Sequence, residues 1–181
     1  MLVLVGGGYT FVAYRQLGAI GRQANIAERE LVIANRAYLY LSGVRLTFLP
    51  PSPESNVEIT YPVFNGGQTP ALFTGDFSRI IVAYRAADIG DIGNPATRKQ
   101  TSIIPPRGED PMNAKHWTYL SDDELTDIEN GTRKLFFYGF LFYFDVFQYS
   151  HKTWFALSYN GSRGNNMPMA FVTEPGYNRF D

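Results

Sequence analysis

Asp145 and His151 are the two side chains best spaced for acid–base chemistry. They flank a predicted turn in the stretch DVFQYSH, so a hairpin there would bring a carboxylate beside an imidazole. A carboxylate that orients a histidine can make a general base, which also requires a nucleophile or a substrate pocket. The alternative is a structural hydrogen bond that closes the hairpin. We favour the structural interpretation because the sequence offers no catalytic set around this pair.

Residue types that bind metals or act as nucleophiles are scarce. The chain has no cysteine, which excludes disulfides, thiolate nucleophiles and cysteine-based metal sites. Its two histidines, His116 and His151, lack a second ligand at the helical or hairpin spacing that a zinc site needs. The acidic run 122–124 follows Ser121 and is better explained as the start of a capped helix. We therefore predict no catalytic residue, no metal and no cofactor.

The stretch NGGQTPA, residues 65–71, raises the question of a phosphate-binding loop. Such a loop needs a helix start or a lysine close behind its glycines, whereas an apolar strand without lysine follows here. We interpret the stretch as a structural turn formed by Asn65, Gly67, Thr69 and Pro70. Gly66 and Gly67 are expected to adopt positive φ. Asn65 is expected to bond its own backbone two residues on, and Pro70 to stiffen the entry to the next strand.

The glycines of MLVLVGGGYTFVAY suggest a dinucleotide-binding loop, but the pattern does not fit. The third glycine of that fingerprint would fall on Phe11, and the helical pattern continues through Glu28 instead of returning to a strand. Residues 1–14 carry no charged side chain and are better interpreted as the end of a transmembrane helix. As a helix they span roughly 21 Å, against a hydrocarbon core of about 30 Å. Either the span begins upstream, or the segment is shallow or shares its burial with a partner.

Residues 15–36 are predicted to form an amphipathic stalk helix. Apolar and small residues recur in steps of three and four, as in a heptad seam: Leu17, Ile20, Ala24, Ala27, Leu31 and Ala34. The seam is rich in alanine, and Gly18 and Gly21 each cost about 1 kcal/mol in a helix interior. Such a helix needs a neighbour, either a second copy or the domain that follows. Arg15, Arg22 and Arg29 follow the apolar run, which favours a cytoplasmic C-terminal domain.

Residues 37–181 are predicted to form an antiparallel, immunoglobulin-like β-sandwich. Short strand-like runs alternate with Pro- and Gly-rich turns, and the aromatic content of 15% favours strands. We expect a strand that is broken or bulged at Gly43, an edge or bulge at Pro62, and a long hairpin over 134–159 whose first arm is apolar on both faces. One short helix is expected near 121–130. Residues 88–114 are predicted to form a long loop with a short strand, KQTSII, in its middle.

Three short motifs follow one another along nearly the whole chain. Their residues are Arg36, Ala37 and Tyr38; Asn65, Gly67, Thr69, Pro70 and Ala71; and Gly139, Tyr143, Asp145, Phe147, His151, Thr153 and Phe155. Their order resembles a group of uncharacterised single-pass bacterial membrane proteins, common in proteobacteria, marked by R-A-Y/W, N-x-G-x-T-P-A and a Y-x-D-x-F…H-x-T-x-F hairpin. The chain departs from the pattern at Gln148, where a turn glycine is common. The resemblance implies a single-pass topology and the fold, and it carries no activity.

Charge and composition narrow the class of function. A net charge of −1 and a pI of about 6.1 give no electrostatic reason to expect a nucleic-acid binder, so we predict no nucleic-acid partner. We expect membrane lipid to contact the N-terminal segment, and a protein partner or a second copy to contact residues 15–36. The leading hypothesis is a non-enzymatic, membrane-anchored protein-binding or accessory subunit of a membrane complex in the inner membrane of a bacterium.

Two other functions stay open at this point. One is a small-ligand-binding or enzymatic β-sandwich that uses the 88–114 loop over the sandwich. It requires a set of polar residues to gather around a closed pocket: Asp88, Asp91, Arg107, Glu109, Asp110 and His116. The other is a structural protein of the cell envelope whose domain lies outside the cytoplasm.

Overall fold

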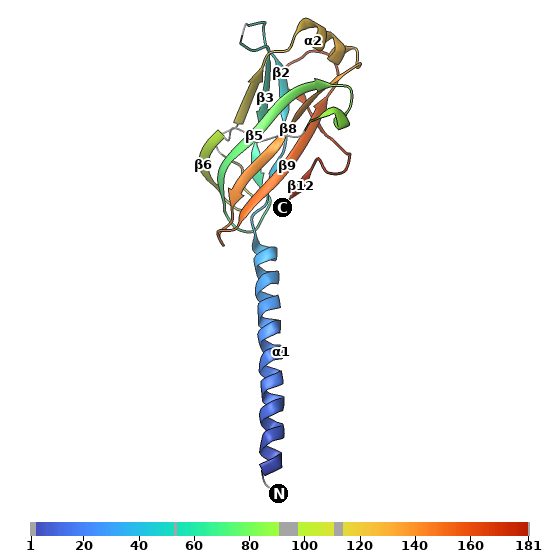
Figure 1. Cartoon of the computed structure of the whole chain (residues 1–181). Coiled ribbons are helices and arrows are strands. Elements are labelled where there is room, and N and C mark those ends of the chain that lie inside the picture. Colours follow the sequence, from blue (N-terminus) through green and yellow to red (C-terminus); the bar gives the residue numbers. More distant parts are fainter. Residues whose placement is uncertain (1–2, 53, 91–97, 111–113, 181) are drawn as a thin grey trace. The chain divides into compact units, whose positions relative to one another are not determined.

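The computed structural model describes residues 3–52, 54–90, 98–110 and 114–180. The chain divides into two compact units, residues 1–36 and 37–181. The first unit is the helix α1, Val3–Asn35, which runs across the predicted boundary between residues 14 and 15 (Figure 1). The side chains of residues 1–15, on which the predicted membrane segment 1–14 depends, lie outside the described part. No helix in the described part of the chain is both long and apolar enough to span a membrane.

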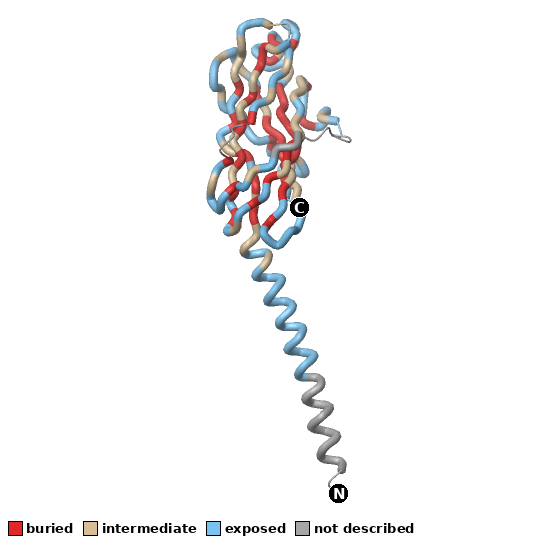
Figure 2. The backbone as a smooth tube through the Cα atoms, turned by 90° about the vertical axis from the view of Figure 1, so that its left-hand side faces the viewer, coloured by how far each residue is buried: buried red, intermediate tan, exposed pale blue. Residues whose placement is uncertain are grey.

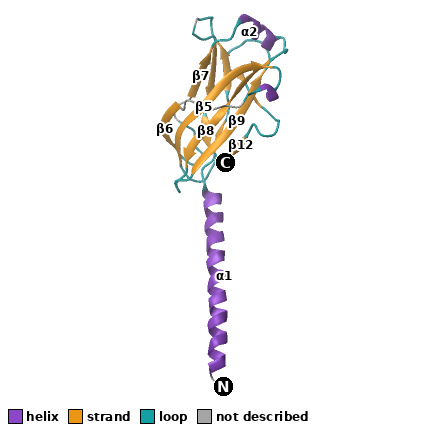
Figure 3. Cartoon of the chain, viewed as in Figure 1, coloured by secondary structure: helices purple, strands orange, loops and turns teal. Residues whose placement is uncertain are grey.

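Strands are the main regular structure of the second unit, and every described pair of strands in its sheets is antiparallel (Figure 3). The smallest sheet pairs β1 (Leu39–Leu41) with β4 (Val63–Asn65). A four-stranded sheet has the order β10 (Met167–Pro168), β2 (Arg45–Phe48), β3 (Val57–Tyr61) and β7 (Ala114–Thr118). The largest sheet has the order β11 (Ala170–Phe171), β9 (Ser150–Tyr159), β8 (Lys134–Phe144), β5 (Ala71–Ala83) and β6 (Arg98–Ile104), and β12 (Arg179–Phe180) also pairs with β9. The unit is therefore mainly β, as predicted.

The chain changes sheet at Gly43 and again at Pro62. Gly43 has a φ of 66° and separates β1 from β2, while Pro62 separates β3 from β4. The backbone N–H of Ser42 donates to the Pro62 carbonyl at 3.4 Å, so the two breaks lie side by side. The irregularities predicted at these two residues are both present, and they let one hairpin contribute to two sheets.

The main hydrophobic core joins β5, β8 and β9 of the largest sheet to the two smaller sheets in a sandwich-like arrangement. The buried segments run through the interior of this unit (Figure 2). Its largest buried side chains include Tyr61 from β3, Phe73 from β5, and Phe137 and Tyr143 from β8. Burying a side chain of this size stabilises the fold by about 1.5–3 kcal/mol. The core therefore joins residues that are distant in the sequence.

The opposite face of β8 is covered as well. Phe136 and Tyr138 pack in a second cluster with Ala86, from the short 3-10 helix η1 (Ala86–Asp88), and with Val172. The segment from Leu135 to Leu141 is buried at every position. The predicted hairpin is thus confirmed, and so is the prediction that its first arm is apolar and covered on both faces.

A bulge in β5 decides which of its side chains face the core. The register of β5 with β6 and β8 shifts between Phe73 and Gly75. Phe73 faces the core before the bulge, and Ile80 and Val82 pack against the same core after it. The inward positions therefore change from odd to even residue numbers. Further along, Gly139 lies opposite Ser78, and a Cβ on Gly139 would collide with the Phe77 carbonyl.

The short helix α2, Asp122–Glu129, begins with the predicted capping box. Ser121 Oγ accepts from the N–H of Glu124 at 3.3 Å, and the Glu124 carboxylate accepts from the N–H of Ser121 at 2.9 Å. The capped-helix interpretation of the acidic run is confirmed. The KQTSII stretch lies in β6, as predicted, so part of the expected 88–114 loop is built into the largest sheet. Residues 91–97 and 111–113 of that loop lie outside the described part.

Candidate functional site

The turn between β8 and β9 is organised by the carboxylate of Asp145. Its Oδ1 accepts from the N–H of Phe147 at 2.9 Å and from the N–H of Tyr149 at 3.0 Å. Its Oδ2 lies 2.8 Å from Nε2 of His151. The side chain of Asp145 is 1% exposed and that of His151 is 9% exposed, so water does not compete strongly for these contacts. The predicted hydrogen bond across the hairpin is therefore present.

Tyr143 and Thr153 continue this row of contacts toward the core. The Tyr143 ring lies 5.3 Å from the His151 ring, centroid to centroid, and the two residues are partners in the β8–β9 register. Thr153 Oγ1 lies 3.5 Å from the Tyr143 hydroxyl. Asp145, His151, Tyr143 and Thr153, all residues of the third sequence motif, therefore form one connected set of contacts.

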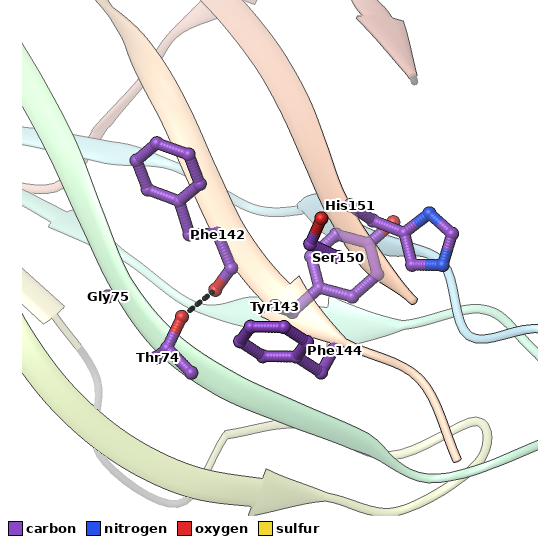
Figure 4. Close-up of a pocket in the computed structure, with 7 residues that line it drawn as sticks. All are labelled: Thr74, Gly75, Phe142, Tyr143, Phe144, Ser150 and His151. Carbon is purple, nitrogen blue, oxygen red and sulfur yellow. Dashed lines mark hydrogen bonds between the residues drawn. The ribbon is translucent and has the colours of Figure 1, made fainter. Parts of the chain in front are cut away.

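A hollow of about 320 Å³ lies beside this hairpin on β5 and β8 (Figure 4). Its lining includes Thr74, Phe142, Phe144, Ser150 and His151. Thr74 Oγ1 donates to the Phe142 carbonyl at 3.2 Å, so this threonine is used within the sheet. Ser150 and His151 are the polar side chains at the other side of the hollow (Figure 4). The largely aromatic lining suits the binding of an apolar group better than the catalysis of a polar reaction.

The corner formed by residues 65–71 is held by the amide of Asn65. Asn65 Oδ1 accepts from the N–H of Gly67 at 2.9 Å and from the N–H of Tyr38 at 3.2 Å. Its Nδ2 donates to the Thr69 carbonyl at 2.8 Å and to the Ile104 carbonyl at 3.1 Å. Asn65 is buried, so its amide is fully used inside the protein. The predicted bond to the backbone two residues on is confirmed.

The prediction that Gly66 and Gly67 adopt positive φ is wrong. Neither is among the described glycines with positive φ, which are Gly43, Gly75, Gly131, Gly161 and Gly176. A Cβ on Gly66 would instead lie 3.0 Å from the Tyr40 ring. The physical reason for a glycine at position 66 is therefore the close approach of an aromatic ring and not the backbone angle.

A polar chain inside the sandwich was missed by the sequence analysis. Tyr61 donates its hydroxyl to Asp76 Oδ2 at 2.7 Å and lies 3.5 Å from Ser78 Oγ, which is 2.9 Å from His116 Nδ1. A serine beside an imidazole resembles an activated nucleophile. Here the order of contacts is Asp–Tyr–Ser–His, which differs from a Ser–His–Asp triad. In the sequence, the only signal was the pair of polar residues Asp76 and Ser78 within an apolar strand.

The contacts known for the polar residues proposed to gather around the 88–114 loop lead to different parts of the chain. Asp88 pairs with Arg85 at 3.1 Å, and Arg107 donates to Gln68 at 3.3 Å. The backbone of Glu109 forms an isolated antiparallel β-bridge with Phe64, and the N–H of Asp110 donates to the Val63 carbonyl. His116 lies in β7. Asp91 lies outside the described residues. Among the described residues no group of three or more His, Asp or Glu side chains could hold a metal ion.

Apolar side chains are exposed at the end of the domain that holds the hairpin turn. Ile103, Leu72 and Phe144 lie in register across β6, β5 and β8, and Ile103 is 68% exposed. Exposed side chains of the turn extend this surface: Val146, Phe147 and Tyr149. We call these six residues the hairpin-end patch. It lies near the corner, because Asn65 donates to the Ile104 carbonyl.

Comparison of the chain with protein-family models, with curated proteins and with solved structures found no match in any of the three. The class that the structure defines is a mainly β domain of antiparallel sheets, preceded by an N-terminal helix. The resemblance to single-pass bacterial membrane proteins stays a hypothesis that rests on the three motifs.

Proposed function

We propose that this protein is a non-enzymatic, membrane-anchored protein-binding subunit and that α1 binds a second helix. The observation that supports this proposal is the exposure of aliphatic side chains along α1. These side chains are between 56% and 66% exposed: Leu17, Ile20, Ile26, Leu31 and Ile33. Burying each one against a partner would contribute about 1.5–3 kcal/mol. An isolated helix gains little of this stabilisation, so a partner is the simplest explanation for the pattern.

The exposed aliphatic residues occupy two sides of the helix. Leu17, Ile20 and Leu31 belong to the predicted heptad seam. Ile26 and Ile33 are one heptad apart, and at about 100° per residue they project from the opposite side. A helix with two apolar sides suits a bundle in which it has a neighbour on each side. The partner can be a second copy of this chain or a helix of another subunit.

The hairpin-end patch supports a second contact surface. Three of its side chains are neighbours through the strand register and the other three belong to the adjoining turn, whereas isolated exposed apolar residues need no explanation. In this proposal the aromatic turn binds protein, and the Asp145–His151 pair keeps the turn in one shape. No chemical step is assigned to the histidine.

The same proposal includes location and fold class. We propose that the N-terminal segment anchors the protein in the inner membrane of a bacterium, that the domain lies on the cytoplasmic side, and that its sandwich is immunoglobulin-like. The anchor is motivated by the uncharged run 1–14, and the side by Arg15, Arg22 and Arg29. The cysteine-free chain allows a clean topology test with a single Thr173→Cys variant, because Thr173 is exposed. We expect an impermeant maleimide to label this cysteine only after the cells are broken. Labelling in intact spheroplasts would place the domain outside and favour a cell-envelope structural protein.

The size of the full-length protein, extracted from membranes in mild detergent, tests both anchoring and association. We expect it to require detergent for extraction and to sediment as an oligomer or a complex. A Leu17→Asn/Leu31→Asn double variant should still need detergent but sediment as a single chain. The matched control Arg22→Gln/Asn25→Ser changes exposed polar residues of the same helix and should sediment like the native protein. A native protein that is a monomer in water without detergent would refute the proposal.

A further inference from the structure

The predicted heptad seam of α1 is uncharged and exposed. All six of its members are exposed in the structure: Leu17, Ile20, Ala24, Ala27, Leu31 and Ala34. Two alanines, Ala24 and Ala27, lie between the larger side chains of Ile20 and Leu31. The distance between two packed helices depends on the side chains at their contact. A helix that packs on this seam must therefore carry small side chains of its own at the height of these alanines.

The opposite side of α1 carries arginines. Arg22, Ile26, Arg29 and Ile33 follow one another in steps of four, three and four, and at about 100° per residue they project away from the seam. All four are exposed. The positions three and four residues from each arginine, where a carboxylate on the same helix could pair with it, hold no acidic residue. If two copies met on this side in register, each arginine would face its own counterpart, and this like-charge contact disfavours a second copy here.

The seam, in contrast, is compatible with a second copy of itself. In a parallel pair in register, alanine faces alanine and leucine faces leucine, so the required small side chains lie at the right height. The residues that flank such a seam pair across the two helices as Gln16 with Gly21, Gln23 with Glu28, and Glu30 with Asn35. No pair joins two like charges, and the amide of Gln23 can donate to the carboxylate of Glu28. Side-chain size and charge therefore both favour the seam over the arginine side.

We propose, building on the function proposed above, that the helix bound by α1 is the α1 of a second copy of this chain, packed parallel and in register through the seam. The parallel direction follows from the proposed anchor, because two copies inserted in one membrane with the same orientation have helices that run in the same direction. In this pair Leu17, Ile20 and Leu31 become buried, and Arg22 and Arg29 project away from the second copy. The arginine side disfavours a third copy, so self-association stops at a dimer.

The absence of cysteine from the chain allows single cysteines to report which residues face each other. Ala24→Cys and Ala34→Cys place a thiol on the seam of the full-length protein, whereas Ile26→Cys and Ile33→Cys place one at nearly the same heights on the opposite side. The oxidant is copper phenanthroline, added to the protein in mild detergent. We expect the seam variants to form a band of twice the chain mass at least about tenfold faster than the opposite-side variants, because only their Cβ atoms come within reach of a disulfide.

The Ala34→Cys variant also reports the direction of the helices. In an antiparallel pair aligned on the same seam, Ala34 would face Leu17, and the two Ala34 residues would be roughly 25 Å apart. A fast cross-link in Ala24→Cys without one in Ala34→Cys would therefore overturn the parallel, in-register pair. Adding Leu17→Asn and Leu31→Asn to the Ala24→Cys variant should abolish the fast reaction, and a reaction that stays fast would show that the contact is not made through the seam.

Sedimentation of the native protein separates the failure of this pairing from the failure of the proposed function. A native protein that sediments as a complex, but whose Ala24→Cys variant stays a single chain or links only to a different protein, would overturn the second copy as the partner and leave helix binding in place. Equal rates for Ala24→Cys and Ile26→Cys would also overturn the pairing, since random collisions do not distinguish the two sides of a helix. A native monomer in water would instead refute the proposed function itself.

Discussion

Asp145 Oδ2 and His151 Nε2 lie 2.8 Å apart at the end of the β8–β9 hairpin, while the other carboxylate oxygen of Asp145 holds two backbone N–H groups of the turn. One buried carboxylate therefore fixes both the backbone of the turn and the orientation of the imidazole. This relationship explains why the two residues are spaced as they are without assigning chemistry to them. Substitutions at Asp145 can therefore separate the contribution of the backbone hydrogen bonds from that of the charge beside His151.

Replacing Asp145 with alanine should destabilise the protein by about 2–4 kcal/mol, because it leaves the N–H groups of Phe147 and Tyr149 and the His151 ring without their acceptor. Urea denaturation measures this loss. Asp145→Asn is the matched control, since its Oδ1 can still accept from both N–H groups while the charge beside His151 is lost. We expect the asparagine variant to lose clearly less than the alanine variant. Equal losses in the two variants would contradict the central role of the turn hydrogen bonds.

Replacing Gln148 with glycine should stabilise the protein by roughly 0.5–1 kcal/mol. Gln148 has a φ of 66°, a conformation that glycine adopts without strain and that a residue with a Cβ adopts at a cost. The gain is smaller than the strain because glycine also raises the entropy of the unfolded chain. Thermal or urea unfolding provides the measurement. Gln148→Ala keeps the Cβ and should show no gain, and a stabilised alanine variant would show that the glutamine side chain, and not φ, is responsible.

Replacing Asn65 with alanine should cost about 2–4 kcal/mol, because the buried amide makes two accepted and two donated hydrogen bonds at the corner. Gln68→Ala is a suitable control, since Gln68 is exposed and should change the free energy of unfolding by no more than about 0.5 kcal/mol. If the corner is structural, the folded fraction of the Asn65→Ala variant should bind its partner normally. A fully stable variant that had lost partner binding would assign the corner to recognition instead.

The features predicted correctly from the sequence are those fixed by neighbours along the chain. The capping box at Ser121 and the Asn65 bond to Gly67 span two or three residues, and the two covered faces of β8 follow from an unbroken apolar run. The hairpin bond between Asp145 and His151 needs only a turn between them. In each case local hydrogen bonding or strand geometry determines the outcome, so the pattern is visible without the rest of the fold.

The features missed depend on contacts between distant strands. Asp76 and Ser78 meet Tyr61 and His116 because β5 lies across from β3 and β7, which no local pattern indicates. Simple alternation from Phe73 would also put Asp76 and Ser78 on the outer face, and the bulge before Gly75 reverses that assignment. Gly66 was misinterpreted for the same reason, since its constraint comes from Tyr40.

Glu58 on β3 makes the unfolding free energy depend on pH in the acid range. Lys115 Nζ lies 3.0 Å from Glu58 Oε1, and the indole N–H of Trp117 donates to Oε2 at 2.9 Å. Burial raises the pKa of this carboxyl, but the hydrogen bonds from Lys115, Trp117 and Thr60 and the positive charge of Lys115 together lower it more, so the pKa of Glu58 lies below its ordinary value of 4.5. A carboxyl with a lowered pKa in the folded state stabilises the protein above the unfolded pKa, and this contribution is lost as pH falls through the folded pKa.

Glu58→Gln should therefore lower the free energy of unfolding near neutral pH by roughly 0.5–1 kcal/mol, a modest effect because Lys115 is partly exposed. It should also make stability less sensitive to pH below about 4.5, where the native protein loses the contribution of the charged carboxylate. Urea denaturation repeated between about pH 7 and pH 3 measures both effects. Glu174→Gln changes an exposed carboxyl and should run parallel to the native curve. If Glu58→Gln also runs parallel to the native curve, the Lys115 and Trp117 contacts do not favour the charged form of Glu58 in solution.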